Sequence, residues 1–163
     1  MKQNLGYYIQ AVNDIVQDTE KIGESMNSYY EEIREAIDKD KVDELSPEKM
    51  TEIKEVFEGG TKKYELIMKK IEQLRPPVKV IGIHKKLERS YIEYIAGCKE
   101  MTMSLDAEKG IDTKLFNSSE EKQDKATDDI SFCITKMSNT SVSYTHLDVY
   151  KRQLQCSPEH RTN

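Results

Sequence analysis

Four long segments of this 163-residue chain repeat apolar side chains at alternating steps of three and four residues. This spacing gathers the apolar side chains on one face of an α-helix, where they can pack against other helices. The segments cover residues 4–38, 46–75, 80–105 and 113–138. The spacing therefore predicts an all-α fold built from four amphipathic helices.

Residues that start, stop or interrupt helices support these boundaries. Ser46-Pro47 suits a helix start, because serine caps the first N–H groups and proline needs no hydrogen bond there. Pro76-Pro77 ends the second helix. The fourth helix has two candidate starts, a capping box at residues 118–121 or an earlier cap by Asp112. Gly59-Gly60 indicates a close helix contact or a slight kink, and a ligand against the bare backbone is the alternative.

The links between the segments are short and lie at residues 39–45, 75–79 and 106–111. Short links place successive helices side by side and antiparallel. We therefore expect an up-down-up-down antiparallel four-helix bundle, which occupies residues 1–141 as one domain. A chain of this length can bury enough surface for an independent core.

Charge and hydropathy exclude several classes of partner. The 30 acidic and 25 basic residues give a net charge of −5, and no clustered basic face indicates nucleic-acid binding. No apolar run reaches the ~20 residues of a membrane-spanning helix, and the first residues lack the apolar stretch of a signal peptide. We expect a cytoplasmic protein. A protein of the cell envelope whose leader is missing before Met1 is the alternative.

Few residues before residue 142 are of types that could act in catalysis or bind a metal or cofactor. His84 is the one histidine there, and we interpret it as a half-buried side chain at a helix start; a phosphotransfer histidine is the alternative, although small residues do not follow it. A carboxylate-bridged di-iron site would need two Glu-x-x-His pairs, which the chain lacks. Cys98 and Cys133 lie on apolar stripes, as unreactive core thiols do. We expect no catalytic residue, no metal site and no cofactor.

Tyrosine is the dominant aromatic residue, and it occurs in two adjacent pairs. The members of Tyr7-Tyr8 or of Tyr29-Tyr30 cannot both point inward from a helix, so at least one of each pair is expected at the rim. The first helix also carries an acidic face. The candidate partner surface consists of Tyr7, Tyr30, Glu24, Glu31 and Glu35.

The stretch Leu74-Arg75-Pro76-Pro77 precedes a helix with His84, Leu87, Tyr91 and Met101–Leu105. This arrangement resembles small all-helical proteins of unknown function from Gram-positive bacteria, over about residues 8–138. The resemblance implies a helical bundle and no catalytic residues. Many such relatives look like lipoproteins or secreted proteins, whereas this chain has no lipobox cysteine near Met1.

Residues 142–153, VSYTHLDVYKRQ, differ in character from the rest. One DNA sequence that encodes them resembles two transposase mosaic-end sequencing adapters joined head to head. We interpret this segment as a translated adapter, and residues 142–163 as a non-native, disordered tail with few packed contacts to residues 1–138. Tyr144, Leu147 and Tyr150 are therefore not expected to fill a cavity in the bundle.

Together these patterns predict a non-enzymatic helical bundle that binds an unidentified protein or plays a structural role. A second copy of the chain is a candidate partner. The alternatives are an exported or envelope-associated protein and a phosphotransfer module that uses His84.

Overall fold

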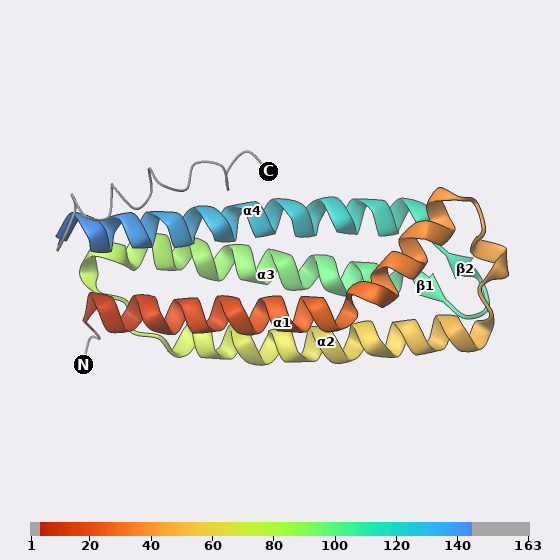
Figure 1. Cartoon of the computed structure of the whole chain (residues 1–163), viewed down its shortest axis with the longest axis horizontal. Helices are drawn as coiled ribbons and strands as arrows, with labels where there is room; N and C mark the ends of the chain where they lie inside the picture. The colour runs from red at the N-terminus through yellow and green to blue at the C-terminus, as the bar shows by residue number, and fades with distance from the viewer. Residues whose placement is uncertain (1–3, 145–163) are drawn as a thin grey trace.

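The computed structural model describes the backbone of residues 4–144 and the side-chain surroundings of residues 4–140. Four long helices dominate this part of the chain: α1 (Leu5–Asp38), α2 (Pro47–Gln73), α3 (Ile81–Met103) and α4 (Thr113–Tyr144). Figure 1 shows each helix running antiparallel to the one before it. Helices α1 and α3 each pack against both α2 and α4. The predicted all-α fold with four helices is confirmed.

Capping side chains fix the starts of three helices. The Asn4 carboxamide oxygen accepts the Tyr7 N–H at 2.8 Å, and the Ser46 hydroxyl oxygen accepts the Lys49 N–H at 3.1 Å. At α4 the Asp112 carboxylate accepts the Leu115 N–H at 3.1 Å. The earlier of the two predicted starts of α4 is therefore the observed one.

The capping box predicted at residues 118–121 is wrong. Ser118 and Ser119 already lie inside α4, where their hydroxyls donate to the carbonyl oxygens of Leu115 and Phe116 at 3.1 and 2.7 Å. A serine hydroxyl can bond back to the preceding helical turn as readily as it caps a new one. The sequence pattern alone does not separate these two uses.

The connection between α3 and α4 contains the only strands of the described chain, β1 (Leu105–Asp106) and β2 (Gly110–Ile111), which pair antiparallel. The Asp106 carboxylate accepts the N–H groups of Glu108 and Lys109 at 2.8 and 2.9 Å, and Gly110 closes the turn with a φ of 88°. Glycine adopts this left-handed conformation without steric cost. Because the hairpin follows, α3 ends at Met103, two residues before the predicted boundary at residue 105. The other links contain short 3₁₀ turns, η1 (Val42–Glu44) and η2 (Val78–Val80).

The helices are held together by two apolar clusters, one toward each end of the bundle. The larger cluster includes Tyr8, Tyr64 and Cys98. The smaller cluster includes Phe57 and Met101 and lies toward the hairpin. Between these clusters, in the middle of the bundle, the side chains leave part of the space unfilled.

Two glycines allow close helix contacts. A Cβ atom at Gly60 would overlap the Met26 side chain of α1, and a Cβ atom at Gly97 would lie 2.8 Å from Gln123 Cγ and 3.2 Å from the Ser119 carbonyl oxygen of α4. The close helix contact predicted at Gly59-Gly60 is confirmed at Gly60.

The α1–α4 pair makes the sparsest contact of the four neighbouring helix pairs.

Within residues 4–144, no helix combines the length and the hydropathy needed to cross a membrane. Helix α4 continues to Tyr144, beyond the predicted end at residue 138, so the predicted disordered tail is wrong for residues 142–144. The expectation that the segment from residue 142 makes few packed contacts, and with it the side-chain placement of Tyr144, Leu147 and Tyr150, lies outside the described side chains.

Candidate functional site

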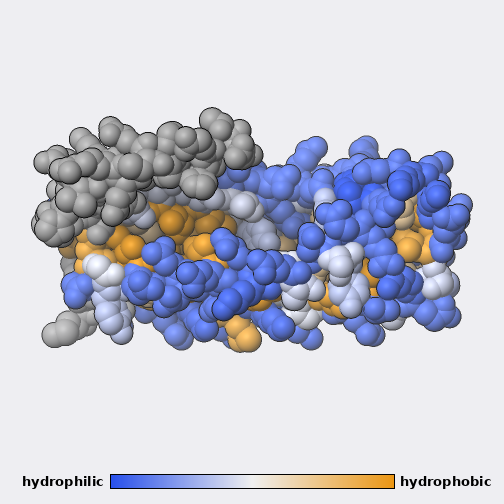
Figure 2. Space-filling model, in the orientation of Figure 1, coloured by the Kyte–Doolittle hydropathy of each residue, from blue (hydrophilic) through white to orange (hydrophobic). Residues whose placement is uncertain are grey.

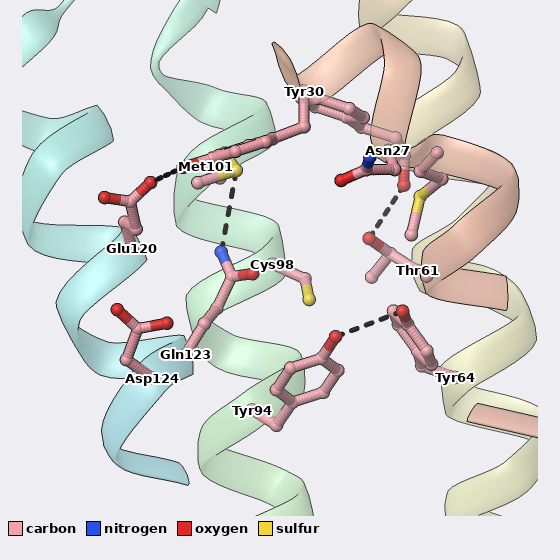
Figure 3. Close-up of a pocket in the computed structure, with 13 residues that line it drawn as sticks. Asn27, Tyr30, Thr61, Tyr64, Tyr94, Cys98, Met101, Glu120, Gln123 and Asp124 are labelled. Carbon is pink, nitrogen blue, oxygen red and sulfur yellow. Dashed lines mark hydrogen bonds between the residues drawn. The ribbon is translucent and has the colours of Figure 1, made fainter. Parts of the chain in front are cut away.

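A cavity of about 400 Å³ lies in the middle of the bundle, where the two apolar clusters meet. Figure 3 shows that all four helices contribute side chains to it. The lining residues are Gly23, Met26, Asn27 and Tyr30 of α1, Phe57, Thr61 and Tyr64 of α2, Tyr94, Cys98 and Met101 of α3, and Glu120, Gln123 and Asp124 of α4. The wall is mixed, with aromatic rings, sulfur atoms and several polar groups.

Two phenols form one wall of the cavity. The Tyr94 hydroxyl donates to the Tyr64 hydroxyl at 3.1 Å, and the two rings meet edge to face with centroids 5.0 Å apart. Burial raises the pKa of Tyr64 to about 12 and raises the pKa of Tyr94 far above its usual range. Both groups therefore stay neutral. The proton of the fully buried Tyr64 hydroxyl meets no acceptor among the described residues.

The other polar groups of the wall are fixed by local bonds. The Thr61 hydroxyl donates to the Phe57 carbonyl oxygen at 2.8 Å. The Gln123 amide donates to the Gly97 carbonyl oxygen at 3.2 Å and approaches Met101 Sδ at 3.6 Å. Thr61 is thereby left with an unused acceptor oxygen beside the cavity.

Cys98 contributes a thiol to the wall. It is a buried, unpaired cysteine, and burial raises its pKa to about 12. A thiol in this state is a poor nucleophile, because the thiolate is the reactive form. The predicted burial of Cys98 and Cys133 is confirmed.

Carboxylates of α4 lie on the side of the cavity that faces α1. Tyr30 donates a hydrogen bond to Glu120 Oε1, and Arg34 Nη1 lies 3.4 Å from Glu120 Oε2 (Figure 3 shows the first of these). The pKa of Glu120 is raised by burial and by the neighbouring charges of Asp124 and Glu121. Arg34 alone therefore does not neutralise the negative charge of the carboxylates at this wall.

An apolar groove of about 200 Å³ continues from the cavity along the α1–α4 seam. It shares Gly23 and Tyr94 with the cavity and is lined mainly by apolar side chains, among them Val12, Leu87 and Ile130. Figure 2 shows apolar surface along this seam, over the half of the bundle that holds the C-terminal end of α4. The cavity and the groove together form one elongated hollow.

His84 lies outside this hollow. It is 4% exposed, so the prediction of a half-buried side chain is corrected to a buried one. The Tyr8 hydroxyl lies 2.6 Å from Nδ1, and Glu88 lies 3.9 Å from Nε2. Its pKa is lowered by burial, which outweighs the opposing charge of Glu88.

The predicted partner surface is not one patch. Tyr7 is 66% exposed near the start of α1, whereas Tyr30 is half-buried in the cavity wall and stacks on Phe116 with centroids 6.0 Å apart. The helix between the two tyrosines separates them by about 35 Å. Three exposed glutamates of α1 complete the predicted set: Glu24, Glu31 and Glu35, the last paired with Lys39 at 2.6 Å.

Sequence reasoning missed most of the cavity wall. The available signal was a polar residue on an apolar stripe, at Thr61 of α2 and at Gln123 of α4. One such residue indicates only a weak stripe. Two such residues on different helices form one polar layer only if the helices place them at the same height along the bundle. Figure 3 shows that the bundle does so for Thr61 and Gln123.

In the part of the chain that the structure describes, no group of three or more His, Cys, Asp or Glu side chains is arranged to hold a metal ion. The chain matches no protein-family model, no curated protein and no solved structure.

Proposed function

We propose that the protein is a non-enzymatic binding protein that holds a small organic molecule in the cavity. The cavity of about 400 Å³ carries this proposal, because it interrupts a core that is packed on both sides. Small-molecule sites typically have volumes of roughly 300–1,000 Å³, apolar walls and a few polar groups.

The chemistry of the wall favours binding over catalysis. The Cys98 thiol and the phenols of Tyr64 and Tyr94 stay protonated at neutral pH. A general base works best with a pKa near the working pH, and His84, the side-chain type whose ordinary pKa lies in that range, does not line the cavity. Its burial likewise gives little support to phosphotransfer, which needs access to the imidazole.

A protein partner has weaker support than a small ligand. Tyr7 and Tyr30 are its aromatic candidates, and they lie too far apart for one compact contact. The cytoplasmic location, the envelope alternative and the resemblance to Gram-positive helical proteins stay predictions. None of them conflicts with a ligand site inside the bundle.

The test is binding of a neutral, polarity-sensitive naphthylamine dye to the purified chain. We expect saturable fluorescence enhancement with one dye per chain. Gly23→Leu should abolish it, because Gly23 lines both the cavity and the groove and the new side chain would occupy their junction. A Cβ at this position lies at ordinary contact distance, 3.5 Å from the Tyr64 hydroxyl.

Gly59→Leu is the matched control, since it makes the same change at an exposed helix position with open space around it. Both leucines favour helix over glycine, so circular dichroism should show intact bundles. Equal dye binding by the two variants, or no saturable binding by the parent chain, contradicts the proposal.

A further inference from the structure

The geometry points to a cationic amphiphile as the ligand, with its ammonium group between Glu120 and Asp124 and its apolar chain along the α1–α4 groove. This inference rests on the proposed function, since it names the class of molecule that the same hollow accepts. Three features of the hollow carry it: its charge, its aromatic rings and its shape.

The charge of the hollow is negative and unbalanced. Glu120 and Asp124 line the cavity and Glu20 lines the groove, whereas no lysine or arginine is among the described lining residues. Arg34 lies beside Glu120 at 3.4 Å but also pairs with Asp38 at 3.0 Å. A bound cation would relieve the repulsion between the two α4 carboxylates, whereas a bound anion would add to it.

Aromatic rings lie next to these carboxylates. Tyr30 reaches Glu120 with its hydroxyl, and Tyr94 contributes its ring to both the cavity and the groove. Ammonium groups are attracted to the faces of such rings, most strongly where water is excluded. The combination of carboxylates and phenol rings favours an alkylammonium head group over a bare metal ion, which would need a closer set of oxygen ligands.

The shape of the hollow fits a molecule with two unlike ends. From Gly23, which the cavity and the groove share, the groove runs back along α1 to Val12. This stretch of helix corresponds to about 16 Å. The groove wall combines five aliphatic side chains with two tyrosine rings, so burying an alkyl chain there is favourable.

Displacement of the neutral dye tests the charge preference. The competitors share a decyl chain and differ in the head group: decyltrimethylammonium, decanol and decyl sulfate, all below their micelle concentrations. We expect the cation to displace the dye at a concentration about tenfold lower than decanol. Decyl sulfate should be the weakest of the three.

The double variant Glu120→Gln/Asp124→Asn should bring the cation to the level of decanol and leave decanol unchanged. The amide that replaces the Glu120 carboxylate retains an oxygen that can accept the Tyr30 hydrogen bond, so the fold is preserved. Glu55→Gln/Glu58→Gln is the matched control, because it removes two charges from positions of α2 that do not line the hollow. This control should keep the cation preference.

The outcomes separate the two proposals. Dye binding without preference for the cation, or a preference that survives Glu120→Gln/Asp124→Asn, overturns the cationic ligand and leaves the binding function standing. Absence of saturable dye binding to the parent chain overturns the binding function itself. A cation preference lost equally in both double variants shows a general charge effect and also overturns the assignment to the cavity.

Discussion

The hydroxyl of Tyr8 and Nδ1 of His84 lie 2.6 Å apart and join α1 to α3 inside the bundle. Burial raises the pKa of Tyr8 and lowers the pKa of His84, so the phenol keeps its proton and the imidazole is neutral. A neutral imidazole carries one N–H, and the Glu88 carboxylate, 3.9 Å from Nε2, favours the tautomer with the proton on Nε2. In this tautomer the Tyr8 O–H donates to Nδ1.

Replacing Tyr8 with phenylalanine should destabilise the bundle through this bond. The change leaves a buried imidazole nitrogen without its donor, which costs about 1–3 kcal/mol in the free energy of unfolding. Urea denaturation followed by circular dichroism measures the loss. Tyr7→Phe is the control, because the Tyr7 side chain is exposed; a loss as large there would contradict the role given to the buried bond.

The stability of the fold should fall in mild acid because of His84. Its folded-state pKa is lowered, so below the unfolded-state value of about 6.5 the unfolded chain binds a proton that the folded chain does not yet take up. This stability is thus complete above that pH and declines as the pH falls, with a slope approaching about 1.4 kcal/mol per pH unit.

Denaturation at about pH 7.5 and about pH 5.5, on either side of the unfolded-state value, checks this. His84→Gln, which keeps an acceptor for Tyr8, should show a smaller change in unfolding free energy between the two conditions. Other titrating groups act in both proteins and cancel in the comparison. An equal change in the two proteins would mean that His84 does not control the pH response.

Two glycine substitutions should shift stability in opposite directions. Gly97→Ala places a Cβ 3.2 Å from the Ser119 carbonyl oxygen and 3.3 Å from the Gln123 nitrogen, and backbone atoms of α4 yield little. It should cost about 1–3 kcal/mol. Gly59→Ala has open space and should stabilise the chain by about 0.5–1 kcal/mol through helix propensity. Thermal unfolding of the two variants gives the signs, and a stabilised Gly97→Ala would refute the close α3–α4 contact.

The helices were predictable because their apolar stripes and caps are local features. Ser46 caps α2 where its position before Pro47 indicates, and the stripe residue Ile53 is fully buried. The hairpin at residues 105–111 was less visible, since two-residue strands leave no periodic pattern. Its signal lies in Asp106 and Gly110, which suit a tight turn.

The cavity was not predictable, because it depends on the level at which the helices meet. The adjacency of Tyr29 and Tyr30 predicts that one member of the pair lies at the rim. The structure places Tyr30 at the rim but turns it toward Glu120 of α4, far away in the sequence. A helical stripe specifies which face of α1 is buried, and it contains no information on which part of α4 that face meets.

The affinity for a cationic amphiphile should depend on pH through Glu120. The groups around this carboxylate are Tyr30 and Arg34 of α1 and Asp124 and Glu121 of α4; burial and the two neighbouring acids raise its pKa. The carboxylate is therefore protonated at a higher pH than an ordinary glutamate, and the attraction for an ammonium group is lost as the pH falls through that raised value. Decyltrimethylammonium should bind more weakly at about pH 5 than at about pH 7.5, while decanol should bind equally at both, because it has no group that titrates in this range. Glu120→Gln should bind the cation with a flatter pH profile, and a profile as steep as that of the parent chain would place the titrating group elsewhere.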